Sequence, residues 1–283
     1  MLAPFPKIFR WHIPLNVESF SDDLRKFVLR HMQNHDALIV SCKKYLDSLQ
    51  KAGYKGRAYQ VYPYTDQSAF TTPSESEVHK FCDEFGIGDE NVISVVARIV
   101  PMKAQDVAIK ALPAILKRFP KTKLLLIGDG SFTSAKRGGL GYHKGAIWQS
   151  KLEELVKGLG IEENVIFTGY LPDKELRAAY ARSDVVVLPS IQEGFGLVVI
   201  EAWLYKKPAV ISSGAGVSEL IVEGENGYVF DPKNPEELAE KAIGVLSHPE
   251  KGVAIGEMGF DTVTKEYAEG TKPIWDIFSE VLG

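Results

Sequence analysis

The chain is short of cysteine, of long apolar runs and of charge of one sign. Its only two cysteines, Cys42 and Cys82, lie far apart and lack metal-ligand spacing, so we expect free, buried thiols in a reducing compartment. No apolar stretch approaches the roughly 20 residues that span a bilayer, and residues 1–4 lack the basic-then-apolar layout of a signal peptide. These absences predict a cytoplasmic protein without a transmembrane segment.

The charge balance gives no reason to expect nucleic acid or an anionic membrane as a partner. Lysine and arginine number 33 against 37 aspartates and glutamates, which gives a formal net charge of −4. With 283 residues, of which 45% are hydrophobic, the chain can bury an ordinary core in one large domain or two smaller ones.

From residue 91 onward, short β-branched runs alternate with helical stretches. The runs are continuously apolar, as in strands buried on both faces, and the expected helix 106–119 repeats Ala108, Leu112 and Ile115 on one face. This alternation predicts a doubly wound α/β domain, whose ligands bind outside the carboxyl ends of its parallel strands. The expected strands are 92–96, 124–127, 165–167, 184–188, 209–211 and 228–230.

The first 66 residues form a different piece, with three short strands and two helices. Parallel strands need cover on both faces and neighbours at their edges, so this piece is too small for a self-sufficient sheet and we expect part of it to be missing on its amino-terminal side. Its strands are expected at 7–10, at 37–41 and up to Val61, with helices from Ser21 and Lys43. The first helix places Leu24, Phe27, Val28 and His31 on one face.

Two further segments separate the expected elements. A turn at 63–66 precedes a helix at 74–85, which Gly86 closes. An irregular insertion is predicted at 131–150, where glycines and basic residues follow a strand end. It is either a mobile surface loop or a lid whose Lys136, Arg137 or Lys144 meets anionic groups, and both readings stay open.

The most informative stretch is 189–202, a strand end followed by a glycine-containing loop and the start of a helix. Gly194 and Gly196 let the backbone approach a ligand, and the unsatisfied N–H groups of a helix start suit a diphosphate. Glu193 lies in the loop and Glu201 about one turn inside the helix, so both carboxylates can bind hydroxyls in one crevice. The alternative is that Glu193 caps the helix and Glu201 is solvated.

Two cations follow the first strand of the larger domain. Arg98 comes directly after the strand and Lys103 ends the connecting loop, so both emerge at the carboxyl edge of the sheet. Arginine grips phosphate oxygens in pairs and lysine adds a point charge, and together they can replace a metal. The alternative is that both are solvated loop charges.

Two more strand ends offer weaker signals. Gly128 follows the second strand and is a candidate for close approach to the ligand, although Gly-Asp-Gly is also a common turn. Thr168 and Tyr170 follow the third strand and could offer hydrogen bonds and an apolar wall to a nucleobase. An ordinary strand-to-turn transition explains the same residues.

These motifs resemble family 4 glycosyltransferases of the GT-B type, which include sucrose and trehalose synthases, mannosyltransferases and relatives of glycogen synthase. The resemblance covers roughly 92–247, in the order and with the spacings of the family. It rests on Arg98 with Lys103, on 124–130, on 167–169, on 183–190 and on the Glu193/Glu201 pair.

The resemblance implies a role for each site residue. Glu193 would contact the hydroxyls of the donor sugar, Glu201 would hold the ribose, and Arg98 and Lys103 would neutralise the diphosphate. Such enzymes retain the anomeric configuration without a metal or another cofactor, and act by stabilising charge on the departing diphosphate. The remaining donor-binding residues would be Gly194, Phe195, Gly196, Leu197, Val198, Gly128, Thr168 and Tyr170.

One departure from the family pattern and one further similarity bear on the site. Ala104 follows the lysine where the family usually has glycine or asparagine, which puts the loop shape in question. The segment Arg10-Trp11-His12 is similar to an Arg-x-His segment of trehalose synthase-like members, by which His12 would face the donor sugar across the cleft. The alternative for His12 is a structural hydrogen bond.

We therefore expect an α/β protein of the GT-B type in three parts. They are the last part of an N-terminal Rossmann-like, acceptor-side domain (1–66), a complete nucleotide-sugar-binding Rossmann-like domain (67–258) and a C-terminal helix that returns to the first domain (259–283).

The expected function is transfer of a hexosyl group from a nucleoside-diphosphate sugar to a hydroxyl of a sugar or other acceptor, with a separate N-terminal-domain subunit or as a homo-oligomer. The alternative is a nucleotide-sugar-binding module without transfer activity. An epimerase or dehydrogenase is disfavoured because no Gly-x-Gly-x-x-Gly turn follows the first strand.

Overall fold

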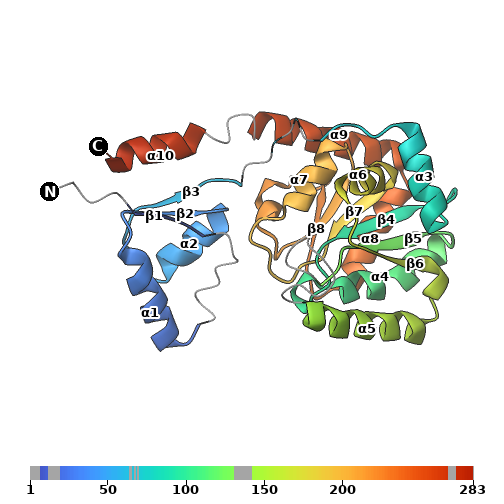
Figure 1. The fold of residues 1–283 in the computed structure, drawn as a ribbon, viewed down its shortest axis with the longest axis horizontal. Coiled ribbons are helices and arrows are strands. Elements are labelled where there is room, and N and C mark those ends of the chain that lie inside the picture. The colour runs from blue at the N-terminus through green and yellow to red at the C-terminus, as the bar shows by residue number, and fades with distance from the viewer. Residues whose placement is uncertain are drawn as a thin grey trace.

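The computed structural model describes residues 7–11, 20–63, 66, 68, 70–130, 142–266 and 272–282. Within them the chain forms two parallel sheets (Figure 1), a three-stranded one in a small unit and a six-stranded one in a large unit. His12, Lys136 and Arg137 lie outside the described residues, as does the side chain of Lys144.

The small unit contains both ends of the described chain. Its strands pair in parallel in the order β1-β2-β3. The last helix of the chain lies beside this sheet (Figure 1), where Ile277 packs with Ile39 and Val61. The elements are β1 (Ile8–Trp11), α1 (Asp22–Gln33), β2 (Ala37–Val40), α2 (Lys43–Lys51), β3 (Ala58–Gln60) and α10 (Lys272–Leu282).

Helix α1 starts as predicted but turns a different face to the sheet. Ser21 is its N-cap and accepts a hydrogen bond from the N–H of Leu24 at 3.4 Å. Phe27 is 70% exposed and Leu24 47%, whereas Met32 is fully buried with Leu29 packed nearby. Of the expected apolar face, Val28 packs against the core whereas Leu24 and Phe27 are exposed, because the helix docks through the side that carries Met32.

The large unit has a six-stranded parallel sheet in the order β6-β5-β4-β7-β8-β9. The chain enters at the central strand β4, moves outward to β6, then returns beside β4 as β7 and moves outward the other way. The strand order therefore reverses between β4 and β7, the switch point at which doubly wound sheets bind ligands. The strands are β4 (Val92–Val96), β5 (Lys123–Ile127), β6 (Val165–Gly169), β7 (Val185–Leu188), β8 (Ala209–Ser212) and β9 (Tyr228–Phe230).

Helices cover both faces of this sheet. Buried side chains on one face pack with α4, α5 and α8, and those on the other with α3, α6, α7 and α9. The predicted doubly wound α/β architecture is thereby confirmed. The helices are α3 (Glu75–Phe85), α4 (Gln105–Arg118), α5 (Tyr142–Leu159), α6 (Asp173–Arg182), α7 (Leu197–Leu204), α8 (Pro235–Leu246) and α9 (Pro249–Glu266).

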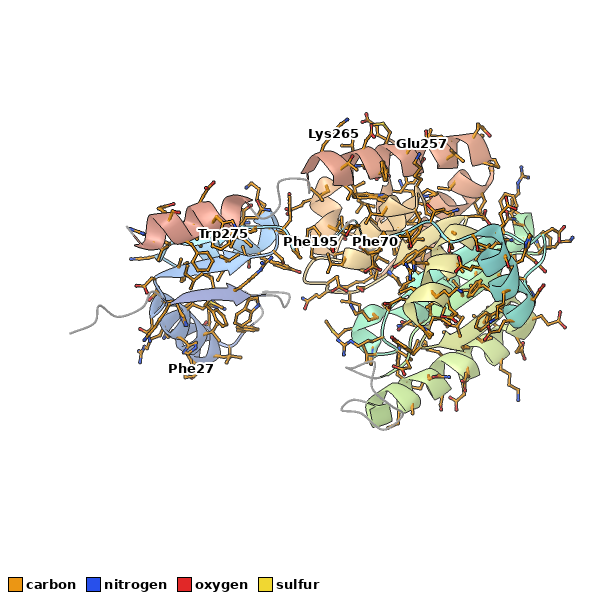
Figure 2. All side chains as sticks on the ribbon, turned by 45° about the horizontal axis from the view of Figure 1, so that its top comes forward. Phe27, Phe70, Phe195, Glu257, Lys265 and Trp275 are labelled. Carbon is orange, nitrogen blue, oxygen red and sulfur yellow. The ribbon has the colours of Figure 1, made fainter. Side chains whose placement is uncertain are left out.

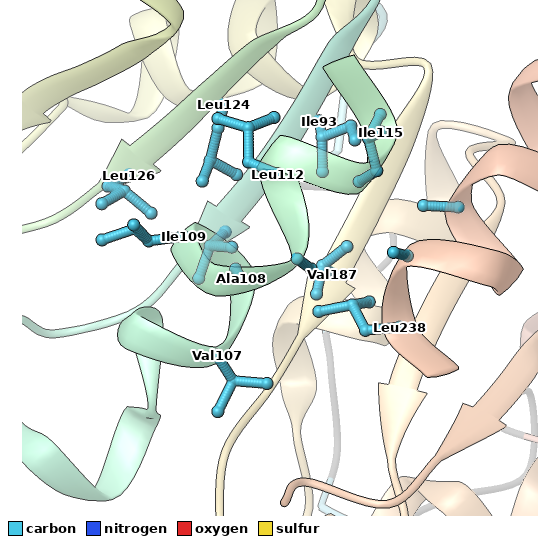
Figure 3. Packing of buried hydrophobic residues seen from close by; sticks show 14 of the residues in the cluster. Ile93, Val107, Ala108, Ile109, Leu112, Ile115, Leu124, Leu126, Val187 and Leu238 are labelled. Carbon is cyan, nitrogen blue, oxygen red and sulfur yellow. The ribbon is translucent and has the colours of Figure 1, made fainter. Parts of the chain in front are cut away.

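The core on the first face is built from aliphatic side chains of α4 and the central strands. Figure 3 shows Ile109 and Leu112 of α4 against Leu124 and Leu126 of β5 and Ile93 of β4, and each of the five is at most 2% exposed. Burying a side chain of this size contributes about 1.5–3 kcal/mol. This packing fixes β4 and β5, and so places the loops that follow them.

Two expectations about segment boundaries differ from the structure. The predicted irregular insertion 131–150 ends early, because α5 begins at Tyr142 and its Trp148 packs against the core. The boundary between 258 and 259 falls inside α9, where Val263 is fully buried against the α7 side of the large unit. The helix that returns to the small unit is α10.

Candidate functional site

The loops after β4 and β7 meet at the switch point. The N–H of Ile191 donates to the carbonyl oxygen of Met102 at 3.0 Å, which ties the two loops together. One turn of 3₁₀ helix, η3 (Pro101–Lys103), then presents the ammonium group of Lys103, which forms an ion pair with the carboxylate of Glu193. Both side chains are 18% exposed. The structure thus brings together a predicted cation and a predicted carboxylate.

A third loop, after β8, holds the backbone of Glu193. The N–H of Glu193 donates to Gly214 at 3.1 Å, and Gly216 donates back to the carbonyl of Glu193 at 3.2 Å. A Cβ atom on Gly214 would lie 2.0 Å from the carbonyl oxygen of Ile191, so only glycine fits there. The Ser190 hydroxyl donates to the Glu193 carboxylate at 3.3 Å. Three loops therefore converge on Glu193.

Helix α7 begins directly after the Glu193 loop. Its N-cap, Gly196, has φ +110° and makes no side-chain capping bond. The hydrogen bonds that the structure describes for the Glu193 carboxylate come from Lys103 and Ser190, and the alternative that Glu193 complements the dipole of α7 stays open. The first N–H groups of α7 open beside the loop, which is the arrangement that stabilises an anion.

Arg98 lies on the neighbouring loop, after β4 as predicted. Its carbonyl oxygen accepts a hydrogen bond of 2.7 Å from the side chain of Gln105, which is fully buried. Gln105 in turn accepts from the indole N–H of Trp148 at 3.2 Å. The side chain of Gln105 is therefore fixed by two hydrogen bonds, and it holds the backbone of the loop in place at Arg98.

Ala104 takes the backbone shape of the residue it replaces in the family pattern. It has φ +50° and ψ +43°, the left-handed region that glycine and asparagine favour. It is fully buried at the start of α4. The alanine side chain is therefore accommodated in a left-handed backbone conformation.

Glu201 lies in the second turn of α7, as predicted, but in a different set of contacts. The Tyr180 hydroxyl donates to its carboxylate at 2.6 Å. Burial raises the pKa of Glu201, and the Tyr180 hydrogen bond lowers this pKa in part. The alternative that Glu201 is solvated is therefore wrong.

Glu201 lines a cavity of about 220 Å³ between α6, α7 and the segment before α3. None of the described residues that line it belongs to the Glu193 loop, and the shared crevice of the two carboxylates stays a prediction. The lining residues are Phe70, Asp173, Leu176, Arg177, Tyr180, Glu201 and Tyr205.

The weaker candidates have structural explanations in part. Gly128 has φ +129°, and a Cβ atom there would lie 2.3 Å from the carbonyl oxygen of Ala97, so the neighbouring backbone already requires glycine. Thr168 donates its hydroxyl hydrogen to the carbonyl of Gly169 at 2.9 Å. Tyr170 is 50% exposed at the carboxyl end of β6. Their contacts with a ligand stay predictions.

Among the loop residues expected to bind the donor, Phe195 has a buried side chain. It is 4% exposed and packs against Tyr62 with ring centroids 5.3 Å apart, between the two units (Figure 2). Its side chain therefore joins the units, and its carbonyl oxygen accepts from the N–H of Val217 at 2.7 Å. Leu197 is 37% exposed and Val198 is partly buried.

The sequence interpretation missed the residues that contact this loop from the small unit. Ser41 and Tyr45 donate hydroxyl hydrogens to the carbonyl oxygens of Gly194 and Glu193. Ser41 is the last residue of the expected strand 37–41, at the carboxyl end at which parallel sheets place ligand contacts. That position was a usable signal for Ser41, whereas nothing in the pattern indicated Tyr45.

Neither a metal-binding cluster nor a membrane-spanning helix occurs in the described part of the chain. Within the described ranges, no group of three or more His, Cys, Asp and Glu side chains is arranged to hold a metal ion. In the same part of the chain, no helix combines the length and apolarity needed to cross a membrane. Both cysteines are free and buried, and burial raises the pKa of the Cys42 thiol to about 11.

A doubly wound sheet with a cation and a carboxylate at its switch point, joined to a second parallel sheet, defines an α/β protein of the GT-B type. Residues 80–261 match the model of the family Glycosyl transferases group 1, and the chain belongs to this family. Membership in this family argues against the interpretation of the chain as an epimerase or dehydrogenase.

Similar proteins agree with the assignment. The chain is 28% identical over 240 residues to the GDP-mannose-dependent alpha-(1-6)-phosphatidylinositol monomannoside mannosyltransferase of Mycolicibacterium smegmatis, covering 82% of this chain and 58% of the relative. HepE of Anabaena, solved in complex with UDP-glucose, shares the fold with a TM-score of 0.84 at 24% identity, over 97% of this chain and 72% of HepE.

A third similar structure matches the large unit. The C-terminal domain of a glycosyl transferase group 1 family protein from Francisella tularensis is 28% identical, with a TM-score of 0.61. It covers 72% of this chain, and 98% of that domain is matched. The chain spans about half the length of the curated relatives it matches, between 36% and 58% for the first three.

Proposed function

We propose that this chain binds the donor of a retaining, metal-independent family 4 glycosyltransferase, which moves a hexosyl group from a nucleoside-diphosphate sugar to an acceptor hydroxyl. The observation that carries the proposal is the ion pair of Lys103 with Glu193 at the switch point. It puts a cation suited to a diphosphate beside a carboxylate suited to sugar hydroxyls.

Each group has a distinct task in this proposal. Arg98 and Lys103 supply two positive charges, and the amino end of α7 adds N–H donors for the diphosphate. Glu193 accepts hydrogen bonds from the hexose, and Glu201 accepts them from the ribose. His12, which lies outside the described residues, would face the hexose from the small unit.

The chemical step is a substitution at the anomeric carbon. Its bond to the phosphate oxygen breaks, and a bond to the acceptor oxygen forms on the same face, so the configuration is retained. The acceptor proton goes to the departing diphosphate. Because charge builds up on that diphosphate, fixed cations and N–H donors around it lower the barrier without a metal.

Two comparisons support the class of donor. One relative is named for its dependence on GDP-mannose, and one structure with the same fold holds UDP-glucose. Both ligands are nucleoside-diphosphate hexoses, and they differ in base and in sugar. The trehalose or sucrose synthase-like subgroup, a separate subunit or homo-oligomeric partner and a cytoplasmic location stay predictions.

A thermal-shift screen in EDTA tests the donor class. The panel contains UDP, GDP and ADP, with UDP-glucose, GDP-mannose and ADP-glucose. A ligand at one hundred times its Kd stabilises the folded chain by about 2.7 kcal/mol, which raises the Tm by several degrees for a chain of this size. No shift with any member of the panel would overturn the proposal.

Two variants then test the site. Glu201→Ala is expected to weaken binding of the nucleotide and of its sugar alike, since it removes the ribose contact. Glu193→Ala is expected to reduce hexosyl transfer more than nucleotide affinity. If both variants bind the donor as the parent chain does in calorimetry, the site assignment is wrong.

Transfer itself separates the enzyme from a binding module. The donor that binds is prepared with a labelled hexose and incubated with an acceptor. One mixture contains this chain alone, and the other also contains the N-terminal domain of a relative as a separate polypeptide. Hexosyl transfer in either mixture supports the proposal. Donor binding without transfer in both mixtures favours the binding module.

A further inference from the structure

The amino end of α2 in the small unit contacts the backbone of the Glu193 loop in the large unit. The Tyr45 hydroxyl donates to the carbonyl oxygen of Glu193 at 2.5 Å, and the Ser41 hydroxyl donates to the carbonyl oxygen of Gly194 at 2.6 Å. Tyr45 is 7% exposed and Ser41 2%. Two consecutive carbonyl groups of the loop are therefore held from the small unit.

These bonds set the direction of the loop's N–H groups. In a trans peptide the N–H points opposite to the C=O of the same unit, and the described residues contain no cis peptide. Because the carbonyl of Glu193 points at Tyr45, the N–H of Gly194 points away from Tyr45. The loop cannot turn this peptide over without breaking the Tyr45 bond.

The same end of α2 also holds the loop after β8. The ammonium group of Lys44 donates to the carbonyl oxygens of Ala215 at 2.6 Å and Ser213 at 3.2 Å. The loop after β8 is the one that exchanges backbone hydrogen bonds with Glu193. The small unit therefore holds both the Glu193 loop and the loop that supports it.

The contact is apolar around its hydroxyl groups. Cys42 and Tyr45 belong to one buried cluster with Phe195, Ala215 and Val217 of the large unit. Water has little access to such a contact, so a hydroxyl removed there is not readily replaced by water. The carbonyl of Glu193 then keeps the N–H of Gly216 and loses its Tyr45 donor, and the carbonyl of Gly194 loses its Ser41 donor. Removing one hydroxyl is therefore expected to destabilise the conformation of the Glu193 loop.

We infer that Tyr45 and Ser41 are positioning residues, which hold the Glu193 loop in the orientation that binds the hexose of the donor. The inference rests on the proposed function for the identity of the ligand, because Glu193 is assigned to the hexose there. Nucleoside and diphosphate groups are assigned to Glu201, Arg98 and Lys103. Loss of the Tyr45 bond is thus expected to weaken binding of the hexose more than binding of the nucleotide.

Tyr45→Phe tests this inference against Tyr54→Phe as a matched control. Tyr54 is 6% exposed and belongs to the same apolar cluster, but its hydroxyl donates to Arg57 at 3.3 Å within the small unit. Ser41→Ala is a second test variant. A control and a test variant each lose one buried hydroxyl, so unspecific destabilisation affects both.

The first readout is amide hydrogen exchange, which needs no ligand. Gly216 and Val217 donate to the carbonyls of Glu193 and Phe195. Their exchange is expected to be about three- to tenfold faster in Tyr45→Phe and Ser41→Ala, which matches the loss of one ordinary hydrogen bond. Exchange in β5 serves as the reference, and Tyr54→Phe should leave Gly216 and Val217 unchanged.

The second readout is calorimetry with UDP and UDP-glucose, and with GDP and GDP-mannose. For the pair that binds the parent chain, Tyr45→Phe is expected to weaken the sugar nucleotide about three- to tenfold and to leave the nucleoside diphosphate within twofold. A purely structural role would change both affinities by one factor.

The two readouts test the positioning of the loop and the proposed function separately. If exchange at Gly216 and Val217 in Tyr45→Phe equals that in Tyr54→Phe, the inference is overturned, whatever the ligand data show. If the parent chain binds neither pair while exchange responds as expected, the proposed function fails and the positioning of the loop stands. Equal weakening of both ligands in Tyr45→Phe also overturns the selective role.

Discussion

The carboxylate of Glu201 lies beside aromatic side chains. The Tyr180 hydroxyl donates to it, and the ring of Tyr205 stacks on that of Tyr180 with 5.6 Å between centroids. Burial raises the pKa of Glu201 because the charged form loses hydration. The folded state therefore binds a proton more tightly than the unfolded state. The stability that this proton confers is complete below the unfolded pKa and is lost as the pH rises through the folded pKa.

Glu201→Gln removes this titration while keeping an acceptor for Tyr180. The variant is expected to exceed the parent chain in free energy of unfolding at pH 8, with the difference shrinking at pH 4.5. Urea unfolding at both values measures it. The same substitution is expected to weaken nucleotide binding, because an amide is a poorer acceptor for ribose hydroxyls than a carboxylate. A difference independent of pH would contradict the assigned burial.

Glu77→Gln is the matched control of opposite sign. The Ser74 N–H, with Lys174, lowers the pKa of Glu77 to about 2. The stability from Glu77 is present above the unfolded pKa and is lost as the pH falls towards 2. Glu77→Gln is therefore expected to lower the free energy of unfolding at neutral pH, with the loss disappearing in acid.

Ala104 and Ala108 provide a second test position with its matched control, because both are buried and lie about one helical turn apart. Glycine at 104 relieves the cost of about 1–2 kcal/mol for a left-handed L-residue, which offsets the loss of one buried methyl. Ala104→Gly should therefore stay within about 0.5 kcal/mol of the parent. Ala108→Gly, inside α4, should lose about 1–2 kcal/mol in urea unfolding. Equal losses would refute the backbone argument.

Single residues could be predicted where position in the fold decides their role. Arg98, Lys103 and Glu193 follow strands, and the edge of a parallel sheet brings such residues together. The bond from Tyr45 to Glu193 could not be predicted, because it joins residues 148 positions apart through packing of two units. The hydrogen bond from Tyr180 to Glu201 could not be predicted either, because the two residues lie on different helices.

At the scale of elements, α2 has a cap from another part of the chain. Cys42 is its N-cap and makes no side-chain capping bond. The carboxylate of Glu219, on the 3₁₀ helix η5 (Gly216–Leu220), accepts from the N–H of Lys43 at 2.9 Å instead. A carboxylate at a helix start satisfies free N–H groups and complements the helix dipole.

Glu219→Gln is expected to lower the free energy of unfolding by about 0.5–1 kcal/mol, since a neutral amide keeps one acceptor and loses the charge. Urea unfolding at low and high salt measures this loss, which salt should reduce. Glu240→Gln on the exposed side of α8 is the control and should change little. Equal effects of the two substitutions would show that Glu219 does not cap α2.

The strands and the helix ends could be predicted well from the local sequence. The apolar runs predicted all six strands of the large sheet, and Ser74 with Gly86 bounds α3 through a capping box and a left-handed C-cap. The start of α5 was missed because glycines and lysines mask its helical pattern before Trp148. The buried side of α1 depends on the sheet it meets, which periodicity alone does not reveal.

On the scale of the whole molecule, α10 joins the end of the chain to its beginning. Ile277 is 4% exposed against Ile39 and Val61, whereas Trp275 on the same helix is 70% exposed (Figure 2). Ile277→Ala is expected to cost about 2–4 kcal/mol, and Trp275→Ala to stay within about 0.5 kcal/mol. Hydrogen exchange should show the loss in β2 and spare β5. Equal exchange in β2 for both variants would refute this docking.

The division into two parallel sheets was predictable from the order of elements, and the return of the last helix followed from the family resemblance. How the units contact each other was not, because Ser41, Lys44 and Tyr45 look like ordinary residues of a helix start. Their partners are backbone carbonyls, which leave no trace in the sequence.

The donor site is tested most directly by calorimetry of UDP-glucose and GDP-mannose in EDTA with the parent chain, Lys103→Met and Lys121→Met. Lys121 is a control cation, 70% exposed and paired with Asp89. We predict binding by the parent without metal, a loss of about 10- to 100-fold in Lys103→Met, and no change in Lys121→Met. Parent-like binding by Lys103→Met, or binding that EDTA abolishes, would contradict the account.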